Sequence, residues 1–164
     1  MRPAPPSELG DRGVGRWIVA YSGGVDSTVL LHALRQARPN ESMTALHVHH
    51  GLHQEADAWA AHCQRFCDDL GVTLTVVRAS VARDGGEGLE AAARRARYSA
   101  FETETNAQGD VLVTAHHIDD QAETFLLRAL RASGADALGA MRAWRRLGQH
   151  WLWRPLLDVS RADL

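Results

Sequence analysis

Residues 17–28 read Trp-Ile-Val-Ala-Tyr-Ser-Gly-Gly-Val-Asp-Ser-Thr, and this stretch decides the fold. Its first five residues form a short apolar run, which predicts a buried strand. The next six, Ser22–Ser27, predict a glycine-containing turn. A helix is expected from about Ser27 to Arg38, where Pro39 and Asn40 end it. A strand that passes through a turn directly into a helix is the first unit expected of an α/β fold.

The rest of the chain repeats this alternation of strand and helix. Several expected strands are continuous apolar runs, which are typical of strands buried on both faces of a parallel sheet. We therefore expect an α/β fold with a doubly wound, mostly parallel, five-stranded sheet and helices on both faces. After the first unit, the expected strands are 43–48, 72–78, 111–115 and 150–154, and the expected helices are 55–70, 89–107 and 121–132.

The chain has 164 residues, of which 45% are hydrophobic. This suits one globular domain, expected at residues 17–164 behind a flexible arm at residues 1–16. No apolar run approaches the roughly 20 residues that span a bilayer, and the arm has no signal-like stretch, so a cytoplasmic location without membrane contact is expected. The last residues look like the start of another helix, so we expect a fragment of a longer protein.

Charge narrows the classes of function. The formal net charge is −2, so charge alone predicts no nucleic-acid partner. All 18 basic residues are arginine. The absence of lysine excludes a Schiff-base lysine and a Walker A phosphate loop in this chain, because both require that side chain.

The turn at Ser22–Ser27 is the first candidate site. Its glycines let the backbone approach a ligand, and the helix that follows offers free N–H groups and a positive dipole end. The hydroxyl groups of Ser22 and Ser27 complete a cradle suited to a phosphate or pyrophosphate. Asp26 would repel phosphates unless a cation intervenes, which suggests Mg²⁺. The alternative is a tight turn in which an aspartate or serine caps the helix.

A second cluster, His116-His117-Ile118-Asp119-Asp120, follows the fourth expected strand. Its carboxylates suit Mg²⁺ better than its histidines do. The alternative is a capping box with Asp120 at the N-cap and Glu123 three residues later. If the fourth strand neighbours the first, this cluster lies across from the turn at 22–27, and Asp26 and Asp120 are expected to share one Mg²⁺–nucleotide complex.

The third expected helix carries Glu90, Arg94 and Arg97 on one face. The simpler interpretation is a solvated face with a weak Glu90–Arg94 ion pair. The functional interpretation is that both arginines bind phosphates or a nucleobase, for which a planar guanidinium is suited, while Glu90 orients an arginine or a substrate amine.

Three further groups carry competing interpretations. Cys63 and Cys67 share an apolar stripe on the second helix and are expected in the core rather than in a metal or redox site. The histidines at 47, 49, 50 and 53 suit either zinc or, as we favour, a turn that lines a nucleotide pocket. The tryptophans and arginines between 142 and 153 suit either a nucleic-acid surface or a core beside solvated arginines.

The hexapeptide Ser22–Ser27 resembles the pyrophosphate loop of the PP-loop ATP pyrophosphatases, which cleave ATP between its α and β phosphates. Further stretches together resemble the tRNA(Ile)-lysidine synthetase family, and the resemblance covers residues 17–160. Ala137 stands where that family is expected to have glycine. The stretches are Ala115–Thr124, His47–Leu52, Glu90–Tyr98 and Arg154–Leu157.

The resemblance implies a Rossmann-like fold of the adenine nucleotide alpha-hydrolase type and an ATP-dependent ligase. ATP would adenylate the C2 oxygen of the wobble cytidine of tRNA(Ile) with a CAU anticodon, and free L-lysine would then displace AMP to give lysidine. Mg²⁺ is the implied metal and a homodimer one allowed assembly. Most of the tRNA affinity is expected in C-terminal domains. The implied catalytic residues are Asp26, Asp120, Arg94, Arg97 and Glu90, the implied ATP-binding residues are Ser22, Gly23, Gly24, Val25, Asp26, Ser27, His49 and His116, and the implied metal ligands are Asp26 and Asp120.

Two other functions compete. A PP-loop tRNA thiolase would adenylate a base in the same way and deliver sulfur, commonly through reactive cysteines. A non-catalytic module would bind ATP without releasing pyrophosphate, and it would not require aspartates at both 26 and 120.

Overall fold

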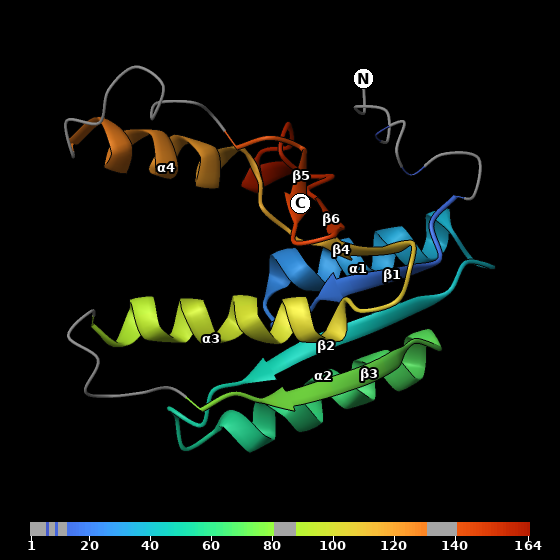
Figure 1. Ribbon diagram of the computed structural model, residues 1–164. Coiled ribbons are helices and arrows are strands. Elements are labelled where there is room, and N and C mark those ends of the chain that lie inside the picture. The colour runs from blue at the N-terminus through green and yellow to red at the C-terminus, as the bar shows by residue number, and fades with distance from the viewer. Residues whose placement is uncertain (1–5, 7–8, 10–12, 81–87, 131–140) are drawn as a thin grey trace.

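The structure, a computed structural model, describes residues 6, 9, 13–80, 88–130 and 141–164. Most of the expected arm, the glycine-rich loop around residues 81–87 and Ala137 lie outside the described residues. Figure 1 shows a single sheet with helices packed against it. The strands are β1 (Arg16–Ala20), β2 (Met43–His49), β3 (Thr73–Arg78), β4 (Asp110–Val113), β5 (Trp144–Leu147) and β6 (His150–Trp153), and the helices are α1 (Val25–Ala37), α2 (Ala56–Leu70), α3 (Leu89–Glu104), α4 (Ile118–Leu130) and the 3₁₀ turn η3 (Arg161–Asp163).

The sheet has the order β3-β2-β1-β4-β6-β5. All neighbouring strands are parallel except β5, which pairs antiparallel with β6. The expected doubly wound, mostly parallel sheet is therefore confirmed, but it has six strands where we expected five. The strand that we did not expect is β5. It carries Arg145 and Arg146 at its centre, so its sequence differs from the apolar runs of the buried strands.

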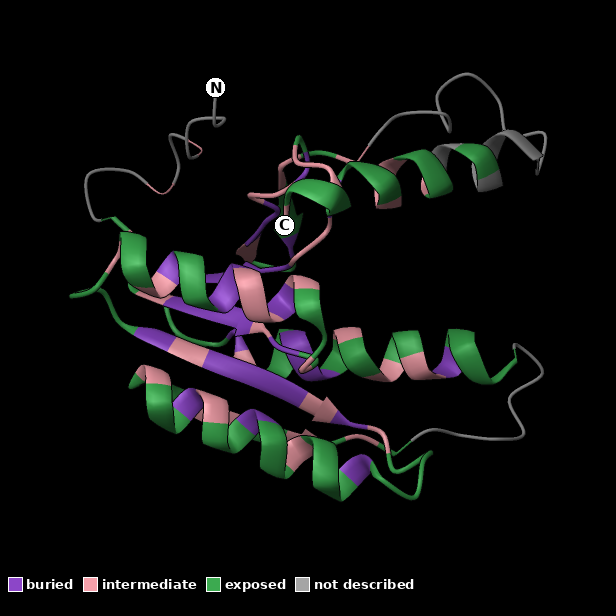
Figure 2. Cartoon of the chain, turned by 180° about the vertical axis from the view of Figure 1, so that it is seen from behind, coloured by how far each residue is buried: buried purple, intermediate pink, exposed green. Residues whose placement is uncertain are grey.

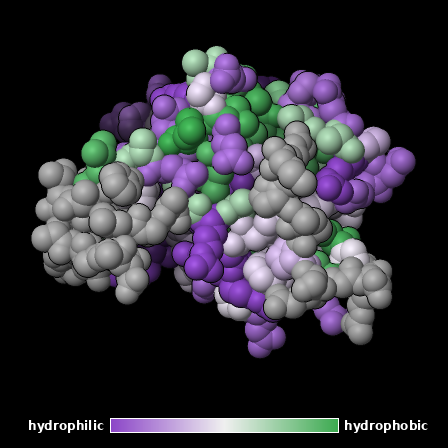
Figure 3. All heavy atoms as spheres, turned by 90° about the horizontal axis from the view of Figure 1, so that it is seen from above, coloured by the Kyte–Doolittle hydropathy of each residue, from purple (hydrophilic) through white to green (hydrophobic). Residues whose placement is uncertain are grey.

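Helices cover both faces of the sheet, as expected. Alternate residues of β1 point to opposite faces: Trp17 and Val19 pack with α1 and α2, whereas Ile18 packs with Phe101 of α3. Figure 2 shows α1 and α2 on the side facing the viewer, with α3 beyond the sheet. Both figures show α4 extending away from the strands. On the face seen in Figure 3, polar and apolar residues are mixed.

Two helix boundaries, the end of α3 and the start of α4, differ by three residues from the sequence-based expectation. α2 ends where expected, because Gly71 adopts the left-handed conformation that closes it (φ 66°). α3 ends at Glu104, three residues early, where the Thr105 N–H and hydroxyl both bond the carbonyl of Phe101. α4 begins at Ile118, three residues before the expected start, and the last two expected residues of this helix lie outside the described part.

The strand order places the loop after β1 next to the loop after β4. β1 and β4 are hydrogen-bonded neighbours, with Ile18 opposite Leu112. The chain leaves β1 to one side toward β2 and leaves β4 to the other side toward β6, so the winding reverses between them. Ligands of doubly wound sheets bind at the carboxyl ends of strands at such a reversal. None of the described helices is long and apolar enough to cross a membrane.

Candidate active site

The loop after β1 is held in shape by its own hydroxyl groups. The Ser22 and Ser27 Oγ atoms lie 3.0 Å apart, and the Gly24 N–H donates to Ser22 Oγ over 3.2 Å. Ser27 and Thr28 both donate their hydroxyls to the Gly24 carbonyl. The N-cap of α1 is Gly24, without a side-chain cap. The alternative of an aspartate or serine as the helix cap is therefore wrong, and Asp26 is left in the first turn of α1.

Gly23 is a glycine for two reasons. Its φ of +83° lies in the region that L side chains rarely adopt, and a Cβ there would lie 2.8 Å from the Sγ of Cys63. Cys63 is fully buried in α2. The Cys63 thiol of α2 therefore packs directly against Gly23 of the loop.

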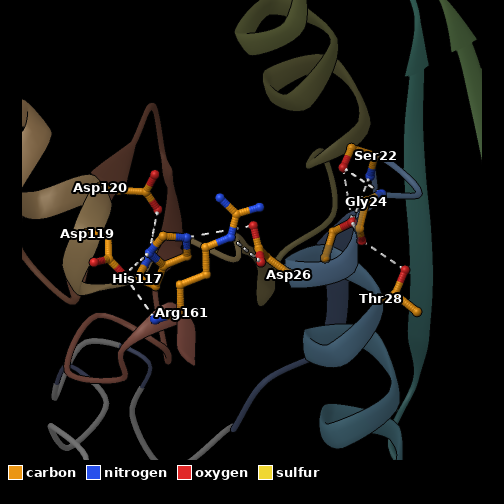
Figure 4. Close-up of polar contacts among 9 residues, drawn as sticks. Ser22, Gly24, Asp26, Thr28, His117, Asp119, Asp120 and Arg161 are labelled. Atoms are coloured by element: carbon orange, nitrogen blue, oxygen red, sulfur yellow. Dashed lines mark hydrogen bonds and ion pairs between the residues drawn. The ribbon is translucent and has the colours of Figure 1, made fainter. Parts of the chain in front are cut away.

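Asp26 faces the second cluster across the β1–β4 reversal, with His117 between them. The imidazole Nε2 of His117 lies 3.7 Å from Asp26 Oδ2, and its Nδ1 lies 3.3 Å from Asp119 Oδ2 and 3.6 Å from Asp120 Oδ2. Figure 4 shows this imidazole flanked by Asp26 on one side and the two other aspartates on the opposite side. The expected meeting of the two clusters is confirmed, and the sequence analysis assigned no role to His117.

Asp120 caps α4, but not in the expected way. Its Oδ2 accepts the backbone N–H of His117 over 2.8 Å, so a residue of the first helical turn reaches back to the residue before the helix. This is the acidic half of a capping box, three residues earlier than the box we expected. The expected box was misplaced because the helix starts at Ile118.

A pocket of about 530 Å³ opens beside the two clusters. It is bounded by the loop after β1, the turn after β2, one face of α3 and the residues that follow β4. Of the expected site residues, Ser22, Gly24, Asp26, Ser27, His49, Arg94, Arg97, His116 and Asp120 line it. Gly23, Val25 and Glu90 are not among its lining residues, and Val25 and Glu90 are exposed.

The turn with His49, His50 and His53, which we expected to line a nucleotide pocket, does line this cavity. Aromatic side chains that were not expected there join it, Tyr98 and Phe101 from α3 and Trp59 from α2. The Arg94 guanidinium lies 5.2 Å from the ring centre of Tyr98. At the other side, His53 stacks on Trp59 with ring centres 4.7 Å apart. Such aromatic faces beside arginines suit a flat, electron-rich ligand such as a base.

Two histidines at the end of β2, His47 and His49, have separate partners. His47 is buried, its Nδ1 lies 3.0 Å from the Tyr21 carbonyl oxygen, and burial lowers its pKa. His49 lies 3.2 Å from Asp57, which Arg78 also binds. Among the described residues there is no group of three or more histidines, cysteines or acids arranged for a metal ion.

His116 is neutral at pH 7. Its Nδ1 lies 2.7 Å from the Thr114 hydroxyl, and burial, helped by Arg154 and opposed by Asp120, lowers its pKa to about 4. A neutral imidazole at the pocket wall can accept or donate a hydrogen bond without adding charge.

The cysteines and tryptophans mostly belong to the core. Cys63 and Cys67 are fully buried, and burial raises the pKa of the Cys67 thiol to about 11, so the core interpretation is confirmed. Trp153 is buried between Trp17 and Trp144, with ring centres 5.3 and 5.2 Å away. Arg146 lies over Trp151. The tryptophans therefore form a core edge rather than an open nucleic-acid surface.

The site contains one more residue that the sequence analysis missed. Arg161, in η3, donates its backbone N–H to Asp119 Oδ2 over 2.9 Å, and its side-chain Nε lies 3.7 Å from Asp26 Oδ1. Nothing near Arg161 in the sequence marks it, because only the return of the chain toward α4 brings it to the loop.

A family model described as a PP-loop domain matches residues 6–164. The chain is 63% identical over 149 residues to a protein of Xanthomonas campestris named tRNA(Ile)-lysidine synthase. The matched region covers 90% of this chain and 34% of the relative. A Pseudomonas aeruginosa protein of the same name is 54% identical over 156 residues, covering 93% and 35%. The chain thus spans about a third of the length of these curated relatives.

Two solved structures share the fold. The U34-tRNA thiolase NcsA from Methanococcus maripaludis superposes with a TM-score of 0.68 at 15% identity, covering 94% of this chain and 57% of that one. The NH3-dependent NAD synthetase from Campylobacter jejuni superposes with a TM-score of 0.59 at 13% identity, covering 96% and 64%. At such identity these two establish the architecture only.

Proposed function

This chain belongs to the PP-loop domain family, and on that premise we propose that it is the ATP-binding catalytic part of a tRNA(Ile)-lysidine synthase. The observation that carries the proposal is the 63% identity over 90% of the chain to a relative with that name. The pocket at the β1–β4 reversal supports it, because a phosphate loop, carboxylates and arginines line one cavity.

The proposed reaction has two steps. The C2 oxygen of the wobble cytidine in the CAU anticodon of tRNA(Ile) attacks the α-phosphorus of ATP, and pyrophosphate leaves. The ε-amine of free L-lysine then attacks C2, the bond from C2 to the adenylate oxygen breaks, and AMP leaves. The product is lysidine. Both steps depend on positioning and on charge stabilisation rather than on a covalent protein nucleophile.

Residues 22–27 are proposed to hold the β and γ phosphates of ATP through their hydroxyl and backbone N–H groups. Asp26 and Asp120 are proposed to hold Mg²⁺, which would neutralise charge on the phosphate oxygens. The donor set fits: both residues offer carboxylate oxygens, and Asp26 Oδ1 is buried without a hydrogen-bond partner. His117, which lies between them, would have to turn aside or act as a hydrogen-bonding neighbour.

Arg94 and Arg97 are proposed to bind the α-phosphate or the cytosine, since both line the pocket from α3. His49 and His116 are proposed to border the nucleotide. The amine of lysine must lose a proton before it attacks, and Asp119 or Glu90 is the proposed acceptor. Neither is among the residues that line the pocket, but Asp119 lies next to Asp120, which does line it, and contacts His117.

The proposal extends to the organisation of the protein. Residues 17–164 would form the catalytic domain behind an arm at residues 1–16. The protein would act in the cytoplasm, on tRNA(Ile) and free lysine, and a homodimer is compatible with this role.

The thiolase alternative has less support. Sulfur delivery would need an accessible thiol, but both cysteines of this chain are fully buried and burial raises the pKa of each. A non-catalytic ATP-binding module would leave unexplained the aspartates that face the phosphate loop.

The test uses the full-length protein with Mg²⁺–ATP, radiolabelled lysine and unfractionated tRNA. Acid-precipitable label that survives mild alkaline deacylation is expected, because lysine joined to a base resists the alkali that releases a 3′ ester. Pyrophosphate release without label would leave adenylation intact and assign another acceptor. A folded protein that binds ATP but gives neither signal would favour the binding module.

A further inference from the structure

We propose that Arg161 is a phosphate-binding residue of this site and contacts the β and γ phosphates of ATP, the part that leaves as pyrophosphate. The inference rests on the ATP-binding part of the proposed function. Arg161 lies 135 positions after Asp26 in the sequence, outside the stretches whose resemblance suggested a site.

The segment that carries Arg161 is anchored against the start of α4. The Ile118 N–H donates to the Val159 carbonyl over 3.1 Å, and the Gln121 side-chain amide donates to the Leu157 carbonyl over 3.4 Å. The Arg161 N–H donates to Asp119 Oδ2 over 2.9 Å. These bonds fix the backbone of Arg161 beside the second cluster.

The side chain of Arg161 crosses from this anchor to the phosphate loop. Its Nε lies 3.7 Å from Asp26 Oδ1, within ion-pair range but longer than a hydrogen bond. Figure 4 shows the guanidinium between His117 and Asp26, on the side of Asp26 that faces α4. The side chain is 69% exposed, so it can turn without breaking a packed core.

Charge explains what this arginine is suited to do. Three carboxylates, those of Asp26, Asp119 and Asp120, lie around His117 beside the loop's Asp26, and a triphosphate would add further negative charge. When a metal ion takes the Asp26 carboxylate, Arg161 loses that partner, and its fork of N–H donors lies beside the loop. A guanidinium can bind phosphate oxygens with two parallel hydrogen bonds. Lysine, the usual alternative, is absent from the chain.

The experiment measures equilibrium binding of ATP, inorganic pyrophosphate and AMP to the full-length protein with Mg²⁺ and without tRNA. For Arg161→Ala we expect affinity for ATP and for pyrophosphate to fall roughly tenfold or more, the loss typical of a hydrogen bond to a charged group, with AMP affinity unchanged. Arg161→Lys should recover part of the loss, because it restores charge but not the fork.

Neither arginine is among the residues that line the pocket. Arg65→Ala is the matched control, because Arg65 is exposed on α2, which packs on β2 and β3, whereas Arg161 reaches Asp26 at the β1–β4 reversal. It should leave all three affinities unchanged. The assignment would be overturned if Arg161→Ala lowered the affinities for ATP and AMP equally. It would also be overturned if the affinities for ATP and pyrophosphate both stayed unchanged. The lysine-transfer assay tests the proposed function separately, since a protein that makes no lysidine can still discriminate ATP from AMP through Arg161.

Discussion

At the scale of single residues, Asp26 stands out because its carboxylate has no structural task. Its Oδ1 is buried without a hydrogen-bond partner and lies 3.7 Å from the Arg161 Nε, and its Oδ2 lies 3.7 Å from the His117 Nε2. Buried polar atoms are normally bonded, so an exception points to a ligand that is held there. The structural cost of neutralising this carboxyl is therefore small, whereas the functional cost is large.

Replacing Asp26 by asparagine should abolish tRNA-dependent pyrophosphate release while the thermal unfolding midpoint stays within about 2 °C of the parent, as for a surface substitution. The amide keeps the shape but loses the charge that would hold a cation. A pyrophosphate-release assay and a thermal melt check the two halves. Substantial turnover by Asp26→Asn would remove the residue from the proposed metal site.

Gly23 gives a second prediction at this scale. Gly23→Ala should weaken ATP binding by about tenfold and destabilise the fold by about 1–3 kcal/mol, because the new Cβ meets Cys63 Sγ in a strained backbone region. Gly71→Ala is the matched control, since its φ is +66° but nothing lies within 4 Å of its Cβ. It should keep its ATP affinity.

Isothermal titration of ATP and urea unfolding measure both effects. The double variant Gly23→Ala/Cys63→Ala removes the thiol beneath the loop, so it should bind ATP better than Gly23→Ala alone. If the double variant binds no better, the loop is disturbed by backbone strain and not by contact with α2.

At the scale of elements, the pairing of β1 with β4 is secured by a buried ion pair at the end opposite to the site. Arg16 donates to both Asp110 oxygens over 3.2 and 2.7 Å, and the Ala107 N–H also donates to Asp110. The Asp110 side chain is only 1% exposed, and these donors hold its pKa below the usual range despite burial. In addition to the backbone pairing of β1 with β4, one buried carboxylate therefore links the two strands at this end.

Asp110→Ala should lower the free energy of unfolding by about 3 kcal/mol, because it leaves Arg16 without its partner at a buried strand pair. ATP affinity below the melting temperature should stay unchanged, since the pair lies far from the loop along β1. Urea unfolding of this variant is compared with Asp68→Ala, whose carboxylate binds only an exposed glutamine on α2. If both variants lost a similar amount of unfolding free energy, the ion pair between Arg16 and Asp110 would not be needed to hold β1 against β4.

Sequence patterns predicted the buried strands of this protein but not its edge strand. The apolar runs of β1, β2 and β4 predicted buried strands because these strands are covered on both faces. In α3 the apolar Leu89 is half exposed, whereas Ala92, Ala100 and Phe101 are buried. β5 was not predicted, because an edge strand with two central arginines has one neighbour and little burial.

At the scale of the whole molecule, buried histidines make stability depend on pH. Burial lowers the pKa of His47, His50 and His116 in the folded state, the last to about 4. Below a pH of about 6.5, the unfolded chain binds protons that the folded chain does not. Stability from these groups is therefore complete above that pH and is lost as the pH falls toward 4.

We expect the free energy of unfolding in urea to decrease steadily from pH 7 to pH 5. His116→Asn should flatten that decrease, because it removes an imidazole whose pKa burial lowers to about 4 in the folded protein. His62→Asn, at an exposed position on α2, should leave the slope as it is. A slope that is identical in the parent and in His116→Asn would show that His116 is not the group that titrates.

Local sequence patterns predicted the α/β class, the glycine turn after β1, the buried cysteines and the two polar clusters at 22–27 and 116–120. These follow from local patterns, since apolar periodicity, glycines in a turn and the spacing of carboxylates are read within about ten residues. The sequence by itself also determined that any cation binding phosphate in this chain is an arginine or a histidine, because lysine is absent.

Only the tertiary structure decided what faces Asp26. The hydrogen-bonded pairing of β1 with β4 brings residues 26 and 117 together, and the return of the chain past α4 brings Arg161 to the same carboxylate. It also showed that Glu90 lies apart from the described pocket lining, although Arg94 on the same helix belongs to it. Such juxtapositions arise from strand order and helix rotation, which depend on contacts between distant residues and leave no pattern within any one stretch of sequence.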